Sequence, residues 1–83
     1  MSRVIVYTAS SCIYCTLARR LLAKRDVRFE EVDVSHDLEA RARLVRVTGR
    51  RSVPQIFIDG QPVGGYRELS RLARAGALDA LRT

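Results

Sequence analysis

The chain has 83 residues, of which 47% are hydrophobic and 29% are charged. This length allows one compact domain, residues 1–83, and this composition is typical of a globular protein rather than of a disordered tail. No apolar run is long enough to span a bilayer, and no signal peptide precedes the first apolar segment. We therefore expect a cytoplasmic protein that has no membrane partner.

The net charge of +6 comes almost entirely from arginine. It indicates either a solvated basic surface or attraction to an anionic partner, which could be nucleic acid or a small acidic thiol. Because the arginines are spread along the chain and no nucleic-acid motif accompanies them, we expect no nucleic acid to bind.

The first elements form a strand, a helix and a strand. Residues 4–7 are β-branched and aromatic, which predicts a buried strand. From Tyr14 onward, apolar residues recur at helical spacing, and Ser10 or Ser11 is expected to cap this helix. Apolar and polar residues alternate over 29–34, which predicts a second strand, parallel to the first.

A second helix and a third strand follow. Residues 35–37 are predicted to cap a helix that runs to about Thr48, because Gly49 is a natural stop. The inner face of this helix is expected to carry Leu38, Ala42 and Val45. Residues 53–58 predict the third strand.

The remaining segment predicts a hairpin and a helical end. Asp59-Gly60 between two apolar pairs is a strong hairpin signal. One or two C-terminal helices, broken at Gly76, are predicted by Leu69, Leu72, Ala73, Leu78 and Leu81. The order β-α-β-α-β-β-α corresponds to the α/β class, with one four-stranded mixed sheet flanked by helices.

Two cysteines, Cys12 and Cys15, stand where the first strand gives way to the first helix. A cysteine at a helix N-terminus lies near unpaired amide N–H groups, and such cysteines have pKa values of roughly 3.5–7.5. Cys12 is therefore the candidate attacking thiolate. Cys15, one helical turn on, is close enough to resolve a mixed disulfide.

Spacing alone leaves two other interpretations of the cysteine pair. The same spacing makes half of a zinc site, but the chain has only one histidine, His36, and no third cysteine. The other interpretation is a pair of buried, inert thiols. The position between a strand and a helix favours the redox pair over both.

The chain resembles a glutaredoxin of the short bacterial dithiol type over nearly its whole length. The resemblance rests on four segments in order: Val6-Tyr7-Thr8, Cys12-Ile13-Tyr14-Cys15, Ser52 to Gly60, and Gly64-Gly65-Tyr66. It implies a thioredoxin-like fold and a glutathione-dependent enzyme that reduces protein disulfides and glutathione mixed disulfides.

The same resemblance implies the partners. Glutathione would be the reductant, with no permanently bound cofactor and no metal. The substrates would be disulfide-containing or glutathionylated proteins, with ribonucleotide reductase as one candidate, and the protein would be a monomer. Two alternatives stay open: an electron donor fed by thioredoxin reductase, and a dimer that holds an iron–sulfur cluster through Cys12 and glutathione.

The resemblance also implies residue roles. Cys12 would be the nucleophile, Cys15 the resolving thiol and Pro54 a cis proline that faces them. The predicted glutathione-binding residues are Tyr14, Arg51, Ser52, Val53, Pro54, Gly65, Tyr66 and Arg67. Arg50 is either a further contact to the glycine carboxylate of glutathione or a solvated residue of a basic loop.

The chain departs from the family pattern at three positions. Ile13 stands where the family usually has proline, and Ala9 stands where a lysine is common. Arg67 occupies a position that is often acidic, so Glu68 is the remaining candidate to meet the γ-glutamyl ammonium group of glutathione.

Overall fold

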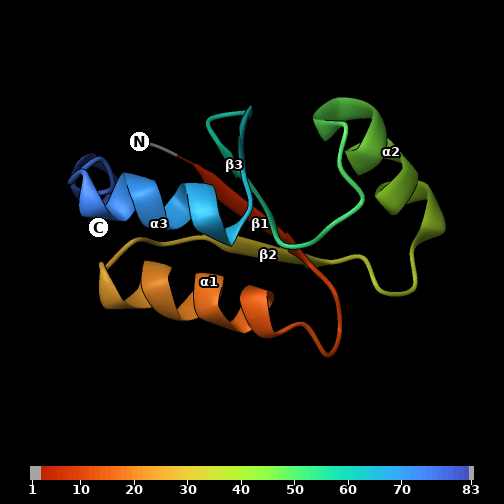
Figure 1. The fold of residues 1–83 in the computed structure, drawn as a ribbon, viewed down its shortest axis with the longest axis horizontal. Helices are drawn as coiled ribbons and strands as arrows, with labels where there is room; N and C mark the ends of the chain where they lie inside the picture. Colours follow the sequence, from red (N-terminus) through yellow and green to blue (C-terminus); the bar gives the residue numbers. More distant parts are fainter. Residues whose placement is uncertain (1–2, 83) are drawn as a thin grey trace.

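Four strands form one mixed sheet in the computed structural model, which describes residues 3–82 (Figure 1). The central strand β1 (Val4–Thr8) pairs in parallel with β2 (Glu30–Asp33) and antiparallel with β3 (Gln55–Ile58). Strand β4 (Gln61–Gly64) pairs antiparallel with β3, so the order across the sheet is β2-β1-β3-β4. The predicted mixed sheet is confirmed.

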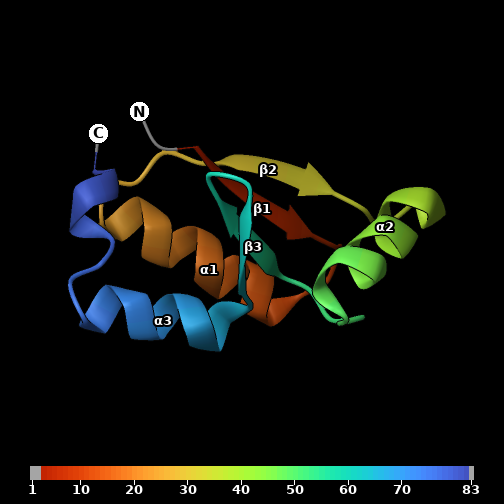
Figure 2. The ribbon, with the colours of Figure 1, turned by 90° about the horizontal axis from the view of Figure 1, so that it is seen from above.

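The helices cover both faces of this sheet. Helices α1 (Ile13–Lys24) and α3 (Tyr66–Arg74) lie side by side on one face, as Figure 2 shows, and a short 3-10 helix η1 (Asp79–Leu81) follows α3. Their core is made of Val4, Val6, Ala18, Leu22, Val27, Ile56, Leu69, Ala73 and Leu78. Helix α2 (Leu38–Thr48) packs against the other face in a smaller cluster. Within residues 3–82, no helix has the length and apolarity needed to cross a membrane.

The N-cap of α1 is Cys12, so the prediction of Ser10 or Ser11 as the cap was wrong. The amide N–H of Ser10 donates to the hydroxyl of Ser35 at 2.6 Å, and the two hydroxyls lie 3.0 Å apart. Ser10 therefore joins the loop after β1 to the loop after β2. Cys12, two residues later, takes the N-cap position instead.

Both ends of α2 match the sequence prediction. The carboxylate of Asp37 accepts from the amide N–H of Ala40 at 2.9 Å, which makes Asp37 the N-cap. Gly49 ends the helix with φ +72°, a left-handed conformation that favours glycine.

The predicted inner face of α2 was wrong for Leu38 and Ala42, whereas the predicted Val45 is half-buried. Ala40 and Leu44 are its buried residues, whereas Leu38 is 83% exposed and Ala42 is also exposed. The buried pair is spaced i, i+4 and packs with Val34, and the small Ala40 side chain suits close approach to the sheet. Apolar residues occur on several sides of α2, so the sequence alone does not determine which side faces inward.

The hairpin and the C-terminal segment follow the prediction closely. Asp59 and Gly60 both have positive φ, 51° and 81°, as the two-residue turn between β3 and β4 requires. Strand β3 begins at Gln55 rather than at residue 53, because Pro54 cannot donate to the sheet. Gly76, with φ 77°, separates α3 from the segment that carries the buried Leu78.

Replacing Leu22 by alanine tests the packing of α1 on the sheet. Leu22 is fully buried, so Leu22→Ala should lower the free energy of unfolding by about 2–5 kcal/mol. Chemical denaturation followed by circular dichroism measures the loss. Leu38→Ala is the control and should change stability by less than about 0.5 kcal/mol, since Leu38 is exposed. Equal losses in the two variants would contradict this packing.

Candidate active site

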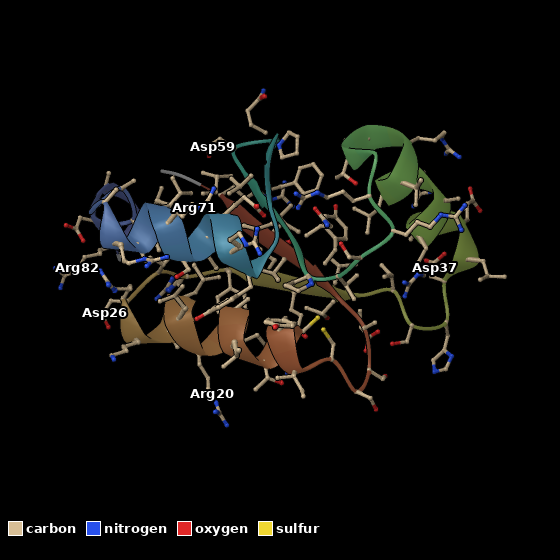
Figure 3. The ribbon with its side chains drawn as sticks, in the orientation of Figure 1. Arg20, Asp26, Asp37, Asp59, Arg71 and Arg82 are labelled. Atoms are coloured by element: carbon tan, nitrogen blue, oxygen red, sulfur yellow. The ribbon has the colours of Figure 1, made fainter. Side chains whose placement is uncertain are left out.

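The two cysteines lie at the start of α1, where Figure 3 shows their sulfur atoms in yellow. Cys12 is half-buried and Cys15 is fully buried. The amide N–H of Cys15 donates to Sγ of Cys12 at 3.1 Å, and the amide N–H of Thr16 donates to the Cys12 carbonyl at 3.2 Å. The sulfur of Cys12 therefore lies where the first-turn amides and the helix dipole favour negative charge.

The second cysteine has the opposite environment. Burial, and next the hydrogen bond with Cys12, raises the pKa of the Cys15 thiol to about 11. Cys15 therefore stays protonated at neutral pH, while Cys12 is the more accessible sulfur. This asymmetry suits one attacking thiol and one resolving thiol.

A loop before β3 lies against the first cysteine. The Val53–Pro54 peptide bond is cis, which confirms the expectation for Pro54, and the Cys12 thiol donates to the carbonyl oxygen of Val53 at 3.6 Å. Sequence reasoning missed the residue that anchors this loop. The side-chain amide of Gln55, 1% exposed, donates to the carbonyl of Ser52 at 2.9 Å and to its hydroxyl at 3.4 Å. A lone glutamine within an apolar strand was the available signal.

Beside the cysteines lies a groove of about 500 Å³, lined by the loop before β3, the start of α1 and one face of α3. It brings together most of the residues predicted to bind glutathione: Tyr14, Ser52, Val53, Pro54, Gly65, Tyr66 and Arg67. Arg51 is the exception, since it is exposed and does not line the groove. Its neighbour Arg50 does line it.

Two tyrosine rings flank the groove from different helices. Tyr14 comes from α1 and Tyr66 from α3, and their ring centroids lie 6.1 Å apart with a tilt of 37°. Tyr14 is 60% exposed, so its ring forms an accessible apolar wall close to Cys12. Such a wall can cover part of a ligand and limit its contact with water.

At the other end of the groove, Glu68 closes the turn that leads into α3. Its Oε1 accepts from the amide N–H of Gly65 at 2.7 Å and from Nη1 of Arg50 at 3.1 Å. These two hydrogen bonds, the backbone one first, hold the pKa of Glu68 below its usual value. Gly64 has φ +122°, and a Cβ there would lie 2.6 Å from Glu68, so glycine leaves room for this contact.

The position of Glu68 changes its expected role. The sequence left it as the candidate for the γ-glutamyl ammonium group, but its carboxylate is already engaged by Gly65 and Arg50. The signal for this was a glutamate three residues after the helix cap, which is the spacing of a capping box. Sequence reasoning did not use that signal.

The described chain offers no ligand set for the zinc alternative. Across residues 3–82, no group of three or more histidine, cysteine, aspartate or glutamate side chains could hold a metal ion.

Comparison with known proteins gives one family. The family model described as Glutaredoxin matches residues 4–63. Glutaredoxin 3 of Escherichia coli K12 is 40% identical over 81 residues, which cover 98% of each chain. The solution structure of glutaredoxin from Brucella melitensis is similar with a TM-score of 0.84 and 43% identity, covering 95% of this chain and 86% of that one. A buckwheat glutaredoxin–glutathione complex gives a TM-score of 0.87 at 25% identity, over 96% of this chain and 76% of that one.

The high pKa of Cys15 can be tested in a Cys12→Ser variant, in which Cys15 is the only thiol. Its reaction with iodoacetamide, followed by mass spectrometry, should be slow at pH 7 and should have a midpoint above that of a free thiol, because burial, the largest cause of the raised pKa of Cys15, remains in this variant. The same variant in denaturant serves as the control and should react with a midpoint near the free-thiol value of about 8.5. A native midpoint below the denatured one would refute the assignment.

The contact between Glu68 and Gly65 predicts an acid-sensitive contribution to stability. The folded-state pKa of Glu68 lies below its ordinary value of 4.5, so the contribution is complete above that pH. It is lost as the pH falls through the lower folded-state pKa. Glu68→Ala should therefore flatten the decline in stability on acidification and lower the free energy of unfolding at pH 7 by about 0.5–1.5 kcal/mol, the range for one hydrogen bond.

Denaturation curves between pH 2 and pH 7 measure this effect. Glu39→Ala is the matched control, because the Glu39 side chain is 84% exposed and pairs with Arg43 on its own helix. An acid decline of equal slope in wild type and Glu68→Ala would contradict the role of Glu68.

Proposed function

Because the chain belongs to the glutaredoxin family of glutathione-dependent thiol–disulfide oxidoreductases, we propose that Cys12 is its nucleophile and Cys15 its resolving thiol. The observation that carries this proposal is the position of the Cys12 sulfur. It accepts the Cys15 amide N–H at the start of α1, lies 3.6 Å from the carbonyl oxygen of Val53, and stands beside the groove.

The proposed reaction follows from the difference between the half-buried Cys12 and the fully buried Cys15. The Cys12 thiolate attacks one sulfur of a substrate disulfide, the S–S bond breaks, and the leaving thiolate takes up a proton. The thiol of Cys15 then loses its proton and attacks the Cys12 sulfur, which releases the second substrate thiol and forms the Cys12–Cys15 disulfide. Two glutathione molecules reduce this disulfide and leave as glutathione disulfide.

The groove supplies the proposed glutathione site. The backbone of Val53, held beside Cys12 by the cis Pro54, can pair with the extended tripeptide as an added strand. The first-turn amide groups of Tyr66 and Arg67 are positioned to hold a carboxylate at the start of α3. Arg50, which lines the groove, is a better candidate for the second carboxylate than the exposed Arg51.

The remaining proposals concern the setting of the enzyme. The chain acts as a single domain and as a cytoplasmic monomer, with disulfide-containing and glutathionylated proteins as substrates. Ribonucleotide reductase is one candidate among them. The basic charge of the chain, +6, supports the approach of the anionic glutathione.

Turnover in a coupled assay with glutathione and glutathione reductase tests the cysteine roles. Cys12→Ser should lose all activity, because no other thiolate can attack. Cys15→Ser should keep activity on a small glutathione mixed disulfide, which a second glutathione can resolve, but should lose reduction of protein disulfides.

An active Cys12→Ser variant would refute the proposal. Recycling by thioredoxin reductase in the absence of glutathione would instead favour the alternative electron donor. A brown protein with visible absorbance after anaerobic purification would favour the cluster-binding dimer.

A further inference from the structure

The groove extends beyond the site proposed for glutathione. Its lining continues along α3 from Tyr66 through Ser70 to Arg74, positions that share one helix face. At 1.5 Å per residue, Gly65 and Arg74 are separated by about 13 Å along the helix axis. An extended tripeptide spans only about 10 Å, and its cysteine must reach Cys12. The far part of the groove is therefore available to a longer ligand.

The charge of the groove lining is one-sided. Arg50, Arg67 and Arg74 line the groove, whereas Glu68 is the sole acidic residue among the described lining residues. The Glu68 carboxylate already receives hydrogen bonds from Arg50 and from the Gly65 amide. Neither Arg67 nor Arg74 forms a side-chain hydrogen bond or ion pair with any residue in the range 3–82. Two guanidinium groups thus face the groove without a compensating carboxylate.

We propose that the surface formed by Ser70 and Arg74, together with the side chain of Arg67 at its border with the proposed glutathione site, binds an acidic segment of the substrate polypeptide next to its disulfide. Carboxylates are the side-chain groups that guanidinium ions recognise best. A polypeptide joined to Cys12 through a mixed disulfide is tethered at one end of the groove, so its flanking residues reach the arginines at high effective concentration. The inference rests on the proposed function, because the tether is the Cys12 mixed disulfide.

The molecule provides a matched control for this surface. Arg71 is exposed on the same helix but does not line the groove. Figure 3 labels Arg71 on α3 and also Arg20 on α1, an exposed arginine that likewise does not line the groove. Arg74→Gln and Arg71→Gln each remove one positive charge from the same helix. A difference in activity between the two variants therefore reports the position of Arg74 in the groove rather than the net charge of the protein.

The test compares two peptides that each contain one internal disulfide. In the acidic peptide three glutamates flank the disulfide on each side, and in the neutral peptide three glutamines do. At low salt and saturating glutathione, wild type should reduce the acidic peptide with a severalfold higher kcat/KM. Arg74→Gln should lower this preference by about two- to fivefold, as expected for loss of one exposed ion pair. Arg71→Gln should keep it, Arg67→Gln/Arg74→Gln should abolish it, and high salt should weaken it in wild type.

Three results would overturn the inference. They are equal kcat/KM for the two peptides in wild type, equal loss of preference in Arg71→Gln, and stronger competition by a single-stranded oligonucleotide than by a disulfide-free acidic peptide. Turnover of a small glutathione mixed disulfide by wild type separates the two proposals. If this turnover is normal while the peptide preference is absent, only the inference fails; if it is absent, the proposed function fails and the inference fails with it.

Discussion

The contact between the Cys12 sulfur and the Cys15 amide N–H connects the fold to the chemistry of this protein. The sulfur is at once the N-cap that begins α1 and the atom that we propose attacks a disulfide. The hydrogen bond from the Cys15 amide holds this sulfur at the helix start, beside the carbonyl oxygen of Val53. The same helix buries Cys15, and this burial raises the pKa of the second thiol, which stays protonated at neutral pH.

The sheet topology gives this helix start its surroundings. Strand β1 ends beside the start of β3, with Tyr7 opposite Gln55 in an antiparallel pair. The loop that leaves β1 therefore meets the loop that enters β3, and Cys12 meets Val53 although 41 residues separate them. Strand β4 then returns along β3 and delivers Gly64-Gly65 to the same end of the sheet. One strand order accounts for the assembly of a site from three distant segments.

The charged side chains that line the groove fall into two groups, one paired and one unpaired among the described residues. Arg50 forms an ion pair with Glu68, and Glu68 also holds the turn before α3, so this pair adds little net charge to the groove. Arg67 and Arg74 have no such partner among the described residues, and they give the groove its positive character. Arg67 stands where the family resemblance led us to expect an acidic residue, and its positive charge makes this surface complementary to carboxylates.

Local sequence determined the order of helices and strands and the Asp59-Gly60 turn. It also determined the end of α2 at Gly49 and the position of the cysteines at the start of a helix. Each of these depends on backbone preferences within a few residues. The family motifs added the cis proline and the outline of the groove. Only the tertiary structure decided which residue caps α1 and which side of α2 faces inward. It also decided that Arg50 rather than Arg51 lines the groove, and that the Glu68 carboxylate accepts from the Gly65 amide. Each of these depends on contacts between segments far apart in the chain, and local patterns do not encode such contacts.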